Sequence, residues 1–128
     1  MRKGLIVLVI VSFAALFLSG CAAKDGEVAH EDIKGKTITI ATGDFFEACD
    51  KWTPGDKVNF TFTSSKPVVF NVHYHEKHAK MYSIKDTLVD EFDGSFVVES
   101  ENIHCCMWKN DNSKYITLTY DMSIEPQE

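Results

Sequence analysis

The stretch Val68-Val69-Phe70-Asn71-Val72-His73-Tyr74-His75 predicts the fold and also holds the best candidate ligands of the chain. It is rich in β-branched and aromatic residues, which favour a β-strand. Because side chains alternate between the two faces of a strand, Asn71, His73 and His75 share one face. The apolar residues between them take the other face. The stretch therefore predicts a strand with a buried apolar face and a polar face that carries two imidazoles.

The same two-residue period continues on both sides of this strand. Alternating segments cover 37–41, 58–63 and 115–124, and shorter strands are predicted at 80–84, 95–99 and 103–109. Turn-forming residues separate them at 53–56, 64–67, 93–95 and 109–113. Residues 45–51 fit either a helical turn or a short strand. Six to eight short strands at this spacing indicate an all-β domain, a single small antiparallel β-sandwich of the jelly-roll kind.

The N-terminus has the features of a bacterial export signal. Arg2 and Lys3 precede an apolar run, 5–18, that is too short for a confident membrane span. The run ends in Leu18-Ser19-Gly20-Cys21, which resembles the lipobox of bacterial lipoproteins. The resemblance implies that Cys21 is lipidated, with palmitate among the acyl chains, and becomes the first residue after processing. A plain secretory signal with a chance cysteine is the alternative.

The predicted organisation is therefore a signal peptide, 1–20, a lipidated tether, 21–36, and one domain, 37–128. The tether is polar and has no apolar period. Ala22 and Ala23, rather than Asp, follow the cysteine, which in the lipoprotein resemblance favours sorting to the outer membrane, on its periplasmic face. The expected localisation is the bacterial cell envelope, with the membrane held through the N-terminal lipid.

The charge of the chain excludes one class of partner. The net charge is −6, and removal of the signal peptide, which carries two basic residues and no acidic one, makes it −8. Such a surface repels nucleic acid. The length after processing suits one small domain. Outside the cytoplasm a disulfide is permitted, and three cysteines besides Cys21 leave one unpaired.

From Cys49 onward the chain resembles the GOLD (Golgi-dynamics) domain, and more closely the small bacterial GOLD-like proteins. The residues that carry the resemblance are Pro54-Gly55-Asp56, Val58–Phe62, Pro67–His75, Gly94-Ser95-Phe96, Cys105, Met107–Asn110 and Tyr115–Tyr120. In the bacterial relatives the penultimate block reads Tyr-Cys-Leu-Met-Trp, whereas here His104 and Cys106 replace the Tyr and the Leu. The family implies a β-sandwich with adaptor or cargo-binding roles and no catalytic activity.

Some GOLD proteins join the regions of Cys49 and Cys105 by a disulfide, so this resemblance implies the Cys49–Cys105 pair. Cys49–Cys106 is the alternative, since adjacent residues of a strand face opposite ways and only one of the two cysteines can easily reach Cys49. The other cysteine is then a buried thiol or a ligand. His104 shares a face with Cys106, but no acid is placed to orient it, so the chain is predicted not to be an enzyme.

The histidine strand suggests a transition-metal site, with copper as the candidate cofactor. His73 and His75 lie about 7 Å apart along the strand, so both can reach one ion. Imidazole, thioether and thiolate are ligands that copper accepts. The completing ligands expected from the sequence are His78, Met81 and Met107, with His104 and Cys106 as extra candidates. Asn71 and Glu76 are placed to orient the imidazoles.

The functional prediction is a non-enzymatic, membrane-anchored lipoprotein that binds or buffers copper. The alternative is an envelope adaptor that binds another protein and no metal, with the histidines forming only a polar surface. The sequence leaves open the identity of the metal or partner, the oligomeric state and the choice between inner and outer membrane. The observation that separates the two readings is whether a third donor lies close to His73 and His75.

Overall fold

A computed structural model describes residues 30–128 as an all-β domain. The six strands are β1 (Ile33–Ile40), β2 (Phe45–Asp50), β3 (Lys57–Glu76), β4 (Ala79–Val97), β5 (His104–Lys109) and β6 (Ile116–Glu125). The all-β, antiparallel prediction is confirmed, and residues 45–50 are a strand rather than a helical turn. The predicted signal peptide and lipidation site lie outside the described residues. Within 30–128 no helix is long and apolar enough to cross a membrane.

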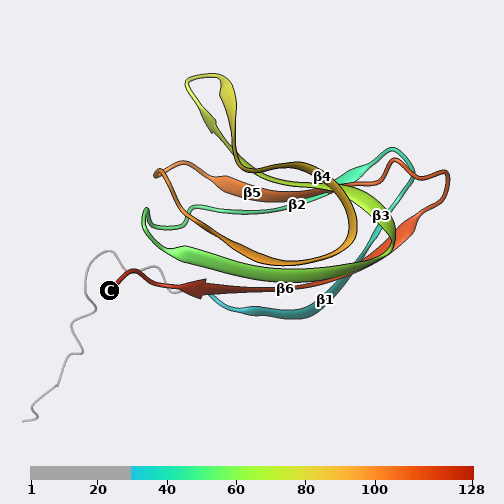
Figure 1. The fold of residues 1–128 in the computed structure, drawn as a ribbon, viewed down its shortest axis with the longest axis horizontal. Coiled ribbons are helices and arrows are strands. Elements are labelled where there is room, and N and C mark those ends of the chain that lie inside the picture. The colour runs from blue at the N-terminus through green and yellow to red at the C-terminus, as the bar shows by residue number, and fades with distance from the viewer. Residues whose placement is uncertain (1–29) are drawn as a thin grey trace, which may run out of the picture.

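The strands form one continuous sheet in the order β1-β6-β3-β5-β2, with β4 paired to β3. The first part of β3 pairs with β6 and the second part with β5. Because β3 and β4 run through both parts, the sheet curls until its two halves face each other. Figure 1 shows β2 and β5 in one layer and β1 and β6 in the other.

Several strand boundaries differ from the sequence prediction. Residues 64–67, predicted as a turn, lie within β3, where the register against β4 shifts between Thr63 and Val68. Pro67 has no N–H to donate to a ladder, and such a residue is tolerated at a bulge or an edge. The bend replaces the expected turn, so the predicted strands 58–63 and 68–75 merge into β3. The predicted strands 80–84 and 95–99 merge into β4, where residues 93–95, predicted as a turn, are paired with β3. In addition, β1 begins at Ile33, so the last residues of the predicted tether belong to the sheet.

The core fills the space between the two layers with aromatic and branched side chains. Trp108 is fully buried at its centre. Its ring lies 5.0 Å from that of Tyr120 in the opposite layer, 5.6 Å from Phe62 and 5.7 Å from Phe70. These contacts tie β5 to β3 and β6, so the strands that carry the candidate ligands rest on the most densely aromatic part of the core.

The hairpin between β3 and β4 is closed by a two-residue turn. Lys77 and His78 both have positive φ, 45° and 71°. Two consecutive residues of positive φ form the turn that best matches the twist of a hairpin. Residues 75–82 are all exposed, and Figure 1 shows the hairpin projecting beyond the rest of its layer.

Candidate functional site

The candidate site lies on the outer face of the layer formed by β2, β5 and β3. The strand register places its side chains in two neighbouring rows across this face. Glu47 lies opposite Met107, which in turn lies opposite Asn71. In the next row Cys49 lies opposite Cys105, and Cys105 lies opposite His73. Three strands therefore bring a carboxylate, two cysteine sulfurs, a thioether and an imidazole together.

Cys49 and Cys105 form a disulfide, as the family resemblance implied. Their Cα atoms are 4.1 Å apart, since the two residues are direct partners in the β2–β5 ladder. The alternative partner, Cys106, is a free thiol buried on the inner face of β5. Burial raises the pKa of the Cys106 thiol far above its usual range, so it stays protonated.

The imidazole of His73 is held in one orientation by a chain of hydrogen bonds. The amide nitrogen of Asn71 donates to Asp86 Oδ1 at 2.8 Å, and Asn71 Oδ1 therefore faces His73 Nδ1, also at 2.8 Å. An amide oxygen only accepts, so the proton of a neutral imidazole must lie on Nδ1. The other nitrogen, Nε2, is left with a lone pair, and it lies 3.5 Å from Glu47 Oε1.

The surroundings of His73 favour the uncharged ring. Its pKa is lowered to about 4, first by burial and then by the positive charges of Lys80 and His75, while Asp86 acts in the opposite direction. The residue is only 3% exposed. At neutral pH the site thus presents an imidazole lone pair beside a carboxylate oxygen, an arrangement in which two electron-rich atoms face each other.

One donor atom each from Glu47, His73 and Cys105 lies within 4.8 Å of the other two, a spacing that could hold a metal ion. Cys105 is engaged in the disulfide, however, so the free donors are the imidazole and the carboxylate. His75 is the nearest further candidate: its ring lies 5.4 Å from that of His73 and perpendicular to it. His75 is exposed and can turn toward the same point.

The structure does not bring all the predicted ligands to this point. Met107 lies on the same outer face, half-buried between Glu47 and Asn71. His78 lies in the exposed hairpin turn. Met81 is the ladder partner of Tyr74, and it therefore belongs to the face opposite His73.

His104 and Cys106 lie in the interior. The ring of His104 packs 4.6 Å from that of Tyr74, and its Nδ1 is 2.8 Å from the carbonyl oxygen of Asn102. Its Nε2 is buried without a hydrogen-bond partner among the described residues. Both side chains point away from the Glu47–His73 pair, since they alternate with Cys105 along β5.

Glu47 is the site residue that sequence reasoning missed. It precedes Cys49 by two positions, so once Cys49 is placed on the outer face, the strand period places Glu47 on that face too. The signal was hidden because 45–51 fits two kinds of secondary structure. The side chain of Glu47 is 31% exposed, which leaves an approach from solvent to a site whose histidine is buried.

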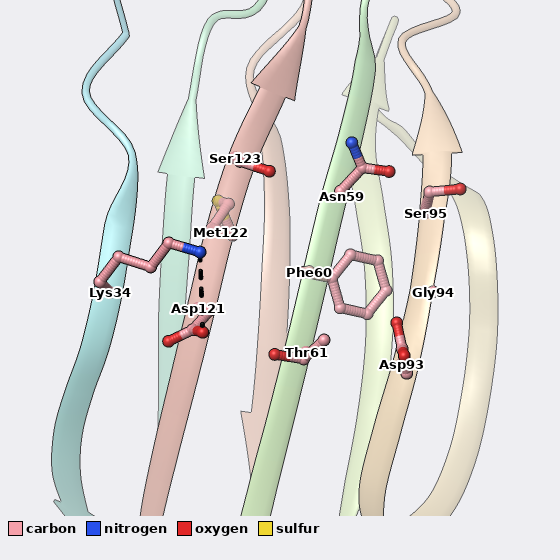
Figure 2. Close-up of a pocket in the computed structure, with 10 residues that line it drawn as sticks. All are labelled: Lys34, Asn59, Phe60, Thr61, Asp93, Gly94, Ser95, Asp121, Met122 and Ser123. Atoms are coloured by element: carbon pink, nitrogen blue, oxygen red, sulfur yellow. Dashed lines mark ion pairs between the residues drawn. The ribbon is translucent and has the colours of Figure 1, made fainter.

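The other layer has an open hollow of its own, between β1, β6, β3 and β4. Figure 2 shows it lined mainly by short polar side chains, with Lys34 reaching across to Asp121 at 3.9 Å. Its lining contains neither histidine nor cysteine. The clustered metal-ligand chemistry of the described residues is therefore on the β2–β5–β3 face.

Comparisons with known proteins leave the family open. No protein-family model and no curated protein matches the sequence. Among solved structures, the chain is similar to the solution structure of a de novo designed double-stranded β-helix, with 11% identity, 73% of this chain and 100% of that chain covered, and a TM-score of 0.39. The GOLD-like resemblance stays a prediction.

Proposed function

We propose that this chain is a membrane-anchored, exported lipoprotein without catalytic activity, and that its domain binds copper at Glu47 and His73. The observation that carries the metal proposal is the position of His73 Nε2, 3.5 Å from Glu47 Oε1. Asn71 fixes the proton on the other ring nitrogen, so an ion between the two groups replaces a repulsion by two coordinate bonds.

The donor types favour copper in its oxidised state. With the disulfide intact, the first two ligands are one imidazole nitrogen and one carboxylate oxygen, and His75 is close enough to supply a second imidazole. Nitrogen and oxygen donors suit Cu(II), which also binds most tightly among the divalent first-row metals. Asn71 then acts as the residue that orients the ligand, and Asp86 fixes Asn71 in turn.

The experiment is a Cu(II) titration of the full chain, purified in mild detergent with the disulfide intact. One ion per chain should bind, and the electron paramagnetic resonance spectrum should show coupling to imidazole nitrogen. His73→Gln and Glu47→Gln should each weaken binding by at least about tenfold.

The matched controls are His30→Gln and Glu125→Gln. His30 pairs with Asp50 outside the site, and Glu125 lies on β6 in the other layer, so neither change should alter the affinity. Equal losses in the site and control variants would mean that copper binds the surface without a specific site. No binding by the wild-type chain would reject the proposal outright.

The second candidate function is that of an envelope adaptor that binds another protein. It is favoured by the projecting β3–β4 hairpin, whose Met81 and Tyr82 are 40% and 39% exposed. Exposed aromatic and methionine side chains are enriched where proteins meet. A pull-down from envelope extracts in which Tyr82→Ser loses a partner retained by His73→Gln would support the adaptor over the copper site.

A further inference from the structure

We infer that the Cys49–Cys105 disulfide is a redox gate on the same site, and that its reduction turns a nitrogen- and oxygen-donor site into a thiolate site for Cu(I). This inference rests on the proposed function, since it assigns the regulation of that copper site. A disulfide sulfur is a weak ligand, whereas a thiolate is a strong one for Cu(I).

The position of Cys105 carries the argument. Its Sγ lies within 4.8 Å of the nearest donor atoms of both Glu47 and His73. Cys105 is the direct ladder partner of His73, so the two side chains emerge side by side on the outer face. Breaking the S–S bond frees this sulfur at the point where the imidazole and the carboxylate already converge.

The second sulfur is released on the same face. Cys49 lies opposite Cys105 and two residues after Glu47 on β2. Reduction therefore offers two thiolates, one imidazole and one carboxylate from three adjacent strands. Two thiolates and an imidazole are a donor set that holds Cu(I) far better than the imidazole and carboxylate of the oxidised chain.

The disulfide is open to a reductant. β2 is the last strand of the sheet order, and Cys49 on it is exposed. A hollow beside the bond is lined by Lys51, Glu101 and Cys105, among others.

The reducing partner is a dithiol. Its first thiolate forms a bond to the exposed Cys49 Sγ, and the S–S bond breaks with Cys105 leaving as a thiolate beside His73. Its second thiolate then displaces Cys49, so the partner leaves as a disulfide and has supplied both electrons. The protons of the partner's two thiols pass to the released cysteines or to solvent, and Cu(I) binding keeps the cysteines deprotonated.

The strand pairing around the site extends beyond the S–S bond. The β2–β5 ladder runs from the Phe45–Lys109 pair to the Asp50–His104 pair, on both sides of the Cys49–Cys105 pair. Trp108 anchors β5 to the core from the inner face. The freed thiols therefore stay on strands that remain paired, which distinguishes a gate from a simple loss of structure.

The test compares Cu(I) affinity in the oxidised and the reduced full chain, without air, by competition with a chromogenic Cu(I) chelator. Cys21→Ser is present throughout, so that no unlipidated Cys21 thiol can contribute to Cu(I) binding. Reduction should tighten Cu(I) binding by at least about 100-fold. Near-ultraviolet circular dichroism before and after reduction checks that the aromatic core persists.

The matched variants are Cys49→Ser/Cys105→Ser and Cys106→Ala. The first should bind Cu(I) as weakly as the oxidised chain under all conditions. The second should keep the full gain, because Cys106 lies next to Cys105 in sequence but faces the core. A gain that disappears with Cys106→Ala would overturn the assignment, and so would a reduced chain that unfolds.

Failure of the gate and failure of the copper site give different results. If the oxidised chain binds Cu(II) through His73 but reduction leaves the Cu(I) affinity unchanged, the gate is rejected and the proposed function stands. If the oxidised chain binds no Cu(II), the proposed function is rejected, and the regulatory inference is withdrawn with it.

Discussion

Removal of the Cys49–Cys105 disulfide should lower the free energy of unfolding by about 4 kcal/mol, from the loop-closure entropy of a 56-residue separation. The loop is long because it encloses β3 and β4 completely. The cost arises mainly in the unfolded chain, which gains freedom, while the β2–β5 ladder holds the two residues together in the folded state. For a domain of this size, the loss corresponds to a fall of roughly 15–30 °C in melting temperature.

The assay is urea denaturation followed by tryptophan fluorescence, comparing wild type with Cys49→Ala/Cys105→Ala. Both Trp52 and Trp108 are buried, so their emission reports the exposure of the core. The slope against urea should rise slightly in the variant, because its unfolded chain is more expanded. Cys106→Ala is the control: it removes one buried sulfur and no covalent link, and should cost about 1 kcal/mol.

A loss of less than about 1 kcal/mol in the double variant would refute the reasoning. It would mean that the unfolded chain keeps structure between Cys49 and Cys105 even without the bond, or that the bond does not form in the folded protein. Mass measurement of the alkylated chain distinguishes these two cases, since a free pair takes up two additional labels.

Three further predictions follow from the same packing. Because the pKa of His73 is lowered to about 4 in the folded chain, against 6.5 unfolded, the unfolded state binds the extra proton between these values. Stability should therefore fall as the pH drops from 6.5 to 4, and His73→Gln should flatten this dependence in denaturant melts; an unchanged slope would contradict the assignment. Asn71→Ala should weaken Cu(II) binding by about 10- to 100-fold in the titration, since the imidazole loses its orienting acceptor. Trp108→Ala should cost about 3–5 kcal/mol in urea melts, against less than about 0.5 kcal/mol for the exposed Phe45→Ala; similar losses at both positions would reject the buried core.

The strands of this chain could be predicted from the sequence because apolar and polar residues alternate in them with a strict two-residue period. Phe60 and Phe62 alternate with polar residues, and both are buried as the period predicts. The sequence did not predict that the short strands join to form the long strands β3 and β4. Ser64–Pro67 and Asp93–Ser95 have the composition of turns, yet they continue the strands as a bend and a hydrogen-bonded segment. Local propensity was overridden there by long-range pairing with β6 and with the facing long strand.

Only the site residues that belong to β3 could be predicted from the sequence. The period of one strand places His73 and Asn71 on a common face, and this needs no partner strand. The identity of the neighbouring donors depends on which strands lie alongside and in which register, and the sequence does not contain that information for an isolated strand. The position of Glu47 beside His73, with β5 between their strands, and the position of Met81 on the opposite face both follow from the register alone.

The alternation of side chains along β5 places core packing on one face of the strand and metal-ligand chemistry on the other. Cys106 and Trp108 face the core, where a reactive thiol would be inert and an aromatic ring contributes packing. Cys105 and Met107 face outward, where Cys105 is bonded to an exposed edge strand and lies beside an imidazole and a carboxylate. A change of redox state at Cys105 therefore acts on the outer face, while the inner residues that hold β5 in place are untouched. The domain can therefore alter its metal-ligand chemistry on one face of β5 while the packing of the other face, around Trp108, is kept.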